Sequence, residues 1–83
     1  MEILVMGAGA RGSYLGARLI EERRHVAFLT GPERRASLMT KRMVVTSQFG
    51  RFHRPVFTPL PDELRQLPQP VKLVIFACRA HLL

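Results

Sequence analysis

The sequence contains few of the residues that would place it in several common classes of protein. Its single cysteine, Cys78, excludes an internal disulfide and offers no cysteine-based metal site. Tryptophan is absent and aromatic residues make up 7% of the chain, so no row of rings is available for stacking nucleic-acid bases. No apolar run is long enough to cross a membrane, and the first residues lack the basic start of a secretory signal. We therefore expect a cytoplasmic protein without a membrane partner.

Acidic residues are also few, and the charge balance is strongly positive. Six Asp and Glu residues stand against 13 Lys and Arg residues, which gives a formal net charge of +7. This excess is compatible with a solvated basic surface, with an acidic partner further along the protein, or with attraction to phosphates. Because the basic residues are scattered and no aromatic platform accompanies them, we expect the phosphates to be those of a coenzyme rather than of nucleic acid.

Residues 3–12, ILVMGAGARG, join a short apolar run to a G-x-G-x-x-G motif. A buried strand that ends in such a turn and continues as a helix is typical of dinucleotide-binding domains. We expect Gly7 to permit the tight turn, Gly9 to let the pyrophosphate approach the backbone, and Gly12 to let helix and strand pack closely. The N-terminus of the following helix would then attract the pyrophosphate.

Periodicity supports this interpretation on both sides of the motif. Apolar or small residues recur after it with helical spacing, and they predict one inner helix face made of Gly12, Leu15, Gly16, Leu19 and Ile20. The apolar residues 26–29 predict a second buried strand, which completes a β-α-β unit. Further elements are predicted at 32–39 (helix), 43–46 and 52–57 (hairpin), 62–67 (short helix) and 71–77 (strand). The predicted fold class is α/β, with a Rossmann-type, mostly parallel sheet, flanking helices and a β-hairpin insertion.

The end of the second strand indicates which coenzyme is bound. An NAD site carries Asp or Glu there, whereas this chain has Thr30 and Gly31, followed by Arg34 and Arg35. A neutral strand end beside arginines suits a 2′-phosphate and hence NADP(H), although each arginine could instead point to solvent. Arg79, just past the last strand, could contact the coenzyme or a substrate carboxylate, or lie on the surface. The three histidines lack metal-ligand spacing, so we expect no metal site.

Three segments, MEILVMGAGARGSYLGARL, HVAFLTGPERRASL and VKLVIFACRAHLL, together with the hairpin-like SQFGRFHRPV, resemble the N-terminal part of the ketopantoate reductases (2-dehydropantoate 2-reductases). The resemblance implies an NADPH-dependent oxidoreductase that reduces 2-dehydropantoate to (R)-pantoate, a step toward pantothenate and coenzyme A. It also implies that residues 1–83 form a partial, truncated dinucleotide-binding domain, without the C-terminal helical domain that carries the catalytic lysine. No catalytic residue is then expected here, the fragment alone would be inactive, and the full-length protein could form a homodimer.

The resemblance also assigns individual residues. Gly7, Ala8, Gly9, Ala10, Arg11 and Gly12 fall on the family's coenzyme loop. The family commonly has an arginine for the 2′-phosphate directly after the second strand. Here Thr30 and Gly31 hold that place, so the role passes to Arg34 or Arg35, and Arg79 stands where the family has a lysine. The expected substrate is a small 2-oxoacid. The alternatives are a reductase of another 2-oxoacid and a non-enzymatic module that binds a nucleotide or nucleic acid.

Overall fold

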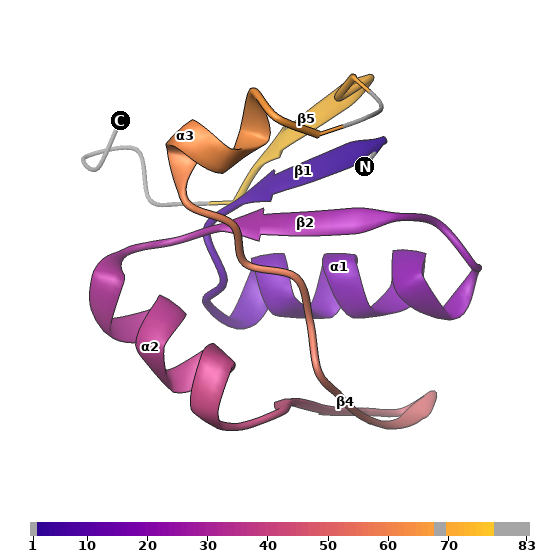
Figure 1. Ribbon diagram of the computed structural model, residues 1–83. Helices are drawn as coiled ribbons and strands as arrows, with labels where there is room; N and C mark the ends of the chain where they lie inside the picture. Colours follow the sequence, from indigo (N-terminus) through magenta and orange to yellow (C-terminus); the bar gives the residue numbers. More distant parts are fainter. Residues whose placement is uncertain (1, 68–69, 78–83) are drawn as a thin grey trace.

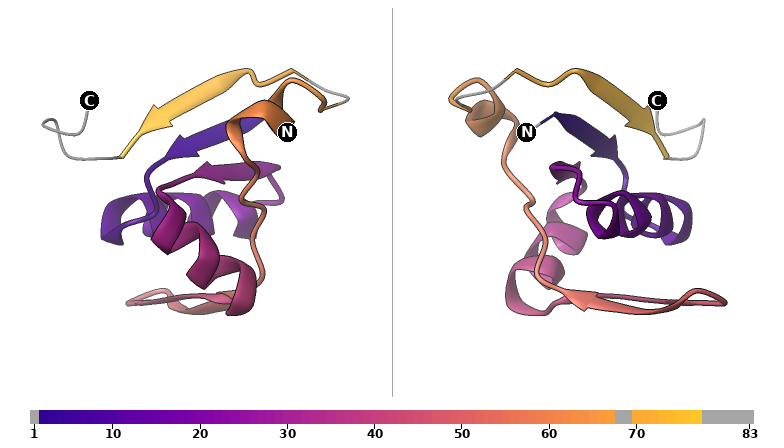
Figure 2. Two further views of the ribbon diagram at one scale, coloured as in Figure 1. Left: turned by 60° about the vertical axis from the view of Figure 1, so that its left-hand side comes forward. Right: turned by 90° about the vertical axis from the view of Figure 1, so that its right-hand side faces the viewer.

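The computed structural model describes residues 2–67 and 70–77, which form an α/β structure in three layers (Figure 1). A parallel sheet with the strand order β2-β1-β5 forms the first layer, helix α1 lies beneath it, and the antiparallel hairpin β3-β4 lies beyond the helix (Figure 2). In chain order the elements are β1 (Ile3–Met6), α1 (Ala10–Glu21), β2 (Val26–Leu29), α2 (Pro32–Thr40), β3 (Met43–Ser47), β4 (Gly50–Arg54), α3 (Pro61–Leu64) and β5 (Leu73–Phe76). The predicted fold class is confirmed.

Strands β1 and β2 and the helix between them form the predicted β-α-β unit. The two strands run parallel, with Ile3 opposite Val26 and Met6 opposite Leu29. Val5 and Phe28 are fully buried between the sheet and α1. Because parallel strands end at the same edge of the sheet, the turn after β1 and the turn after β2 lie side by side.

Helix α1 approaches the sheet through its small residues, which are Gly12, Ser13, Gly16 and Ala17. A Cβ atom on Gly16 would lie 2.1 Å from Cζ of Phe28, so this position has no room for a side chain. Leu15 is 42% exposed, and its predicted place on the inner face is therefore wrong. Because the smallest residues make the closest contact between helix and sheet, the larger Leu15 is turned outward. Leu19 and Ile20 pack against the core as predicted.

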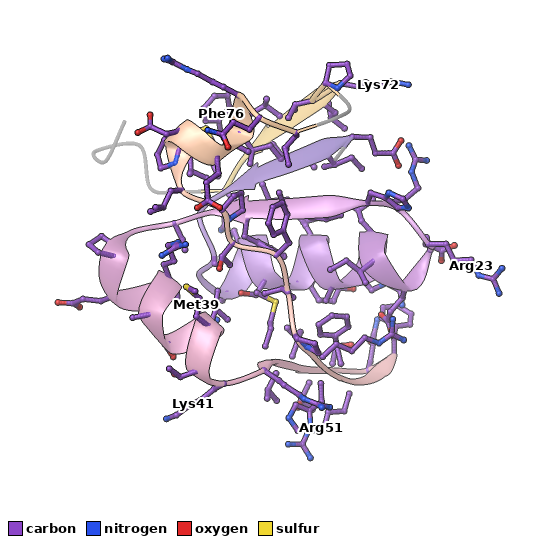
Figure 3. All side chains as sticks on the ribbon, in the orientation of Figure 1. Arg23, Met39, Lys41, Arg51, Lys72 and Phe76 are labelled. Carbon is purple, nitrogen blue, oxygen red and sulfur yellow. The ribbon has the colours of Figure 1, made fainter. Side chains whose placement is uncertain are left out.

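The hairpin covers the face of α1 that points away from the sheet. Met43 and Phe52 are buried there, while Arg51 points away from the helix (Figure 3). The predicted second strand, 52–57, is wrong in its second half, because β4 ends before Pro55, which has no N–H for the ladder. The chain then crosses to the sheet, where the carbonyl of Phe57 accepts a hydrogen bond of 2.9 Å from the amide of Phe28.

Strand β5 pairs only with β1, so it forms an outer strand of the described sheet. Ile75 packs on the core, but Phe76, on the other face, is 62% exposed (Figure 3). Helix α3 is shorter than the predicted 62–67, and a carboxylate oxygen of Glu63 accepts a hydrogen bond from the Leu60 amide at its start. Within the described ranges, no helix has the length and hydropathy needed to cross a membrane.

Candidate dinucleotide-binding site

A large open cleft, about 1300 Å³ in volume, lies at the carboxyl edge of the parallel sheet. Small-molecule pockets typically measure about 300–1,000 Å³, so the volume of this cleft is large enough for a ligand of dinucleotide size. The lining comes from the ends of β1 and β2, from α1 and α2, from the hairpin and from the end of β5. The lining residues are Met6, Gly7, Ala8, Gly9, Ala10, Arg11, Ser13, Tyr14, Leu29, Thr30, Gly31, Arg34, Val44, Val45, Thr46 and Ala77.

The glycine loop is anchored to the sheet at its first residue. The Gly7 amide donates a 2.8 Å hydrogen bond to the carbonyl of Leu29, and the Ala77 amide donates one of 2.9 Å to the carbonyl of Met6. Gly7 has a φ of 104°, a left-handed conformation that side chains disfavour. The predicted role of Gly7 in the tight turn is therefore confirmed.

The other two motif glycines have different surroundings. A Cβ atom on Gly12 would lie 2.1 Å from the carbonyl oxygen of Gly7 and 3.2 Å from Cβ of Ala77, so Gly12 is the close-packing residue that the sequence predicts. A Cβ atom on Gly9 would meet nothing within 4 Å. Gly9 therefore borders open space, and a ligand can approach the backbone at this point.

The electrostatics of the cleft suit an anion. Gly9 caps α1 without a side-chain hydrogen bond, and the first turn of the helix contains no acidic residue. The unpaired amides and the helix dipole therefore leave partial positive charge at this end. Arg11 and Arg34 add two full positive charges, and none of the described residues that line the cleft is acidic.

The two arginines at the start of α2 have different partners. Arg34 lines the cleft, and its Nε donates a 3.0 Å hydrogen bond to the carbonyl of Ala8 in the glycine loop. Arg35 is turned toward the segment after the hairpin, where its Nε donates to the carbonyl of Thr58 at 2.9 Å. Its terminal nitrogen lies 3.7 Å from a carboxylate oxygen of Glu63. Arg79, the third predicted arginine, lies outside the described residues.

Several residues that line the cleft were not predicted from the sequence. Ser13 is 5% exposed and its hydroxyl donates a 2.9 Å hydrogen bond to the carbonyl of Ala8. Ser13 directly follows the third glycine, but the apolar repeat does not include it, so no sequence pattern marks it as buried. Val44, Val45 and Thr46 come from the hairpin, and no local pattern indicates that β3 lines the same cleft as the glycine loop.

A comparison with known families shows to which family the chain belongs. A family model described as "Ketopantoate reductase PanE/ApbA" matches residues 3–82, nearly the entire chain. The chain belongs to the ketopantoate reductase family. The resemblance predicted from the sequence is thereby confirmed. A search of curated proteins gives no match.

One solved structure is similar to this chain over nearly the whole of its length. The chain is similar to the "Putative 2-Dehydropantoate 2-Reductase from Enterococcus faecalis", with a TM-score of 0.79 and 25% sequence identity. The match covers 98% of this chain and 26% of that one, so the chain spans about a quarter of the length of its structural neighbour.

The ketopantoate reductase family is a reductase-like family that binds NAD(P) on a Rossmann-type fold. The residues present fit such a coenzyme, because the space beside Gly9 is open and Arg11 and Arg34 border the same cleft. The fit concerns the dinucleotide as a class, since a diphosphate bridge at a helix N-terminus is common to NAD and NADP.

Proposed function

We propose that the intact protein is an NADPH-dependent reductase that converts 2-dehydropantoate to (R)-pantoate, in the synthesis of pantothenate and coenzyme A. In this proposal residues 1–83 belong to an N-terminal dinucleotide-binding domain, and this chain supplies the coenzyme site. The family match over residues 3–82 and the position of the cleft at the glycine loop support it.

The observation that carries the proposal is the open, cationic cleft at the N-terminus of α1. The backbone amides of residues 9–12 would hold the diphosphate, while Arg11 and Arg34 would face the 2′-phosphate. Arg35 would reach that phosphate only by leaving Thr58 and Glu63, its present partners. Arg79 completes the proposed set of cations. When bound, NADPH supplies the hydride, and the side chains of this chain orient it and balance its charge.

The chemistry on the substrate is assigned to the rest of the protein. The resemblance implies that the general acid is a lysine of a C-terminal helical domain, and we propose no catalytic residue within residues 1–83. The role of this chain is to fix the coenzyme so that its nicotinamide faces the 2-oxoacid.

A second candidate is a reductase of a different 2-oxoacid. Thr30 and Gly31 line the cleft where the family commonly has an arginine, and Arg79 replaces a lysine. Arginine and lysine hold a carboxylate or a ribose with different geometry, so the preferred substrate can differ. Steady-state kinetics of the intact protein with 2-dehydropantoate and a panel of shorter and longer 2-oxoacids separate the two candidates.

Calorimetric titration of the intact protein tests the coenzyme assignment. We expect NADPH to bind more tightly than NADH, with duplex DNA as a control ligand that gives no saturable heat. A preference for NADH would contradict the assignment of NADP. DNA binding that falls steeply with salt, without binding of either coenzyme, would favour the nucleic-acid alternative.

A further inference from the structure

Arg34 connects the first turn of α2 to the centre of the glycine loop. Its Nε donates a 3.0 Å hydrogen bond to the carbonyl oxygen of Ala8, and one terminal nitrogen lies 3.5 Å from the hydroxyl oxygen of Ser13. Arg34 is 26 residues from Ala8 in sequence, so this contact ties two separate turns together. These are the turn after β1 and the turn after β2.

The carbonyl of Ala8 also accepts the hydrogen bond from the Ser13 hydroxyl, at 2.9 Å. One carbonyl oxygen therefore receives donors from both helices that border the cleft. A carbonyl oxygen has two lone pairs, and these two donors use its capacity. Ala8 is 3% exposed and Ser13 is 5% exposed, so water does not readily replace the bond between them, whereas Arg34 reaches the same carbonyl from an exposed position.

Fixing this carbonyl also fixes the amide of Gly9. The peptide bond between Ala8 and Gly9 is planar and trans, because the described chain contains no cis peptide, so its C=O and N–H point in opposite directions. This peptide plane turns about ψ of Ala8 and φ of Gly9, and a glycine at the second position leaves that rotation little restricted. The hydrogen bonds at Ala8 therefore remove freedom from the loop segment that borders the open space of the cleft.

Arg34 keeps donors to spare while it makes these contacts. A guanidinium group carries five N–H donors, and the two contacts use one N–H each. The same side chain can therefore hold the loop and still offer N–H groups to an anion in the cleft. Holding the loop affects any dinucleotide, whereas contact with a 2′-phosphate affects NADP(H) alone.

We propose that Arg34 is a positioning residue of the phosphate-binding loop, which acts through the Ala8 carbonyl on the affinity for NADH and NADPH alike. The inference rests on the proposed function of the cleft and extends it. It differs from the assignment of Arg34 as a reader of the 2′-phosphate, because it predicts an effect on a coenzyme that has no such phosphate.

The test compares NADH and NADPH binding by the intact wild-type protein and by its Arg34→Ala variant, at one ionic strength. We expect NADH affinity to fall by about tenfold, as for the loss of one hydrogen bond from a charged donor. NADPH affinity should fall by at least as much, and an NADPH affinity equal to that of the wild type would also overturn the proposal. NADH affinity within about twofold of the wild-type value would overturn it.

Two further variants separate positioning from a change in charge. Arg24→Ala removes the same charge at the opposite end of β1, where Arg24 pairs with Glu2, and should leave NADH affinity unchanged. Ser13→Ala removes the second donor to the Ala8 carbonyl without changing the charge, and should lower the affinity for both coenzymes. The proposal fails if Ser13→Ala has no effect while Arg24→Ala lowers NADH affinity as much as Arg34→Ala does. The cause would then be the net positive charge of the protein, which both arginine variants reduce.

Hydrogen exchange of the coenzyme-free protein gives a readout that does not depend on binding. Amides of residues 8–14 should exchange faster in Arg34→Ala than in the wild type or in Arg24→Ala, with unchanged exchange in β1 and β2. Equal exchange in residues 8–14 of all three proteins overturns the positioning role. If the wild-type protein binds neither coenzyme, the proposed function fails, and hydrogen exchange still decides whether Arg34 holds the loop.

Discussion

Substitution of Gly9 by alanine should weaken coenzyme binding about ten- to hundredfold and leave the fold intact. Gly9 has φ −74° and ψ −163°, an extended conformation that alanine adopts readily. The added Cβ would meet no atom within 4 Å. The methyl group would instead occupy the space through which, in the proposed binding mode, a diphosphate reaches the backbone amides of the loop.

The expected magnitudes follow from these surroundings. Alanine is a poorer N-cap than glycine, which costs about 0.5–1 kcal/mol, and it restricts the unfolded chain, which contributes about 0.4–1 kcal/mol of stability. The two effects nearly cancel, so the melting temperature should change by about 2 °C or less. Loss of one charge-assisted hydrogen bond to phosphate costs about 1.5–3 kcal/mol, which corresponds to a ten- to hundredfold weaker affinity.

Calorimetric titration with NADPH and with NADH, alongside thermal unfolding, measures both quantities on the same intact protein. The reasoning is refuted if Gly9→Ala binds both coenzymes like the wild type, because the diphosphate would then not approach the loop at Gly9. A large drop in melting temperature would contradict the open space beside this residue. Weakened binding at unchanged stability is the expected result.

Three further predictions concern stability. Gly12→Ala places a Cβ atom 2.1 Å from the Gly7 carbonyl oxygen. The free energy of unfolding, measured by urea titration, should fall by about 2 kcal/mol after the better helix propensity of alanine is taken into account. An unchanged urea midpoint contradicts this prediction. Phe28→Ala removes a fully buried ring and should cost about 3–5 kcal/mol in the same assay, with a loss below about 1 kcal/mol counting against it. The Arg24 guanidinium lowers the pKa of the Glu2 carboxyl below 4.5, so its stabilising effect is present above pH 4.5 and lost as the pH falls through the lowered pKa. Glu2→Gln should therefore show a slightly smaller loss of melting temperature on acidification, and a loss equal to that of the wild type excludes this ion pair as a contributor.

The sequence by itself determined the β1-α1-β2 unit and the place of the glycine loop. Those features depend on short-range chemistry, because an apolar run, three glycines at fixed spacing and a helical repeat lie within about thirty residues of one another. The left-handed Gly7 and the crowded Gly12 follow directly from the motif. The start of α2 at Pro32 could also be predicted from the sequence, because proline suits the first turn of a helix.

Only the tertiary structure decided which side chains meet in the cleft. Arg34 and Arg35 are neighbours in sequence, but the helix directs one toward Ala8 and the other toward Thr58. Leu15 matched the apolar repeat and still lies outside, because the smallest residues set the closest approach of α1 to the sheet. These outcomes depend on contacts between segments far apart in the chain, and the packing of α2 and the hairpin around the loop creates those contacts.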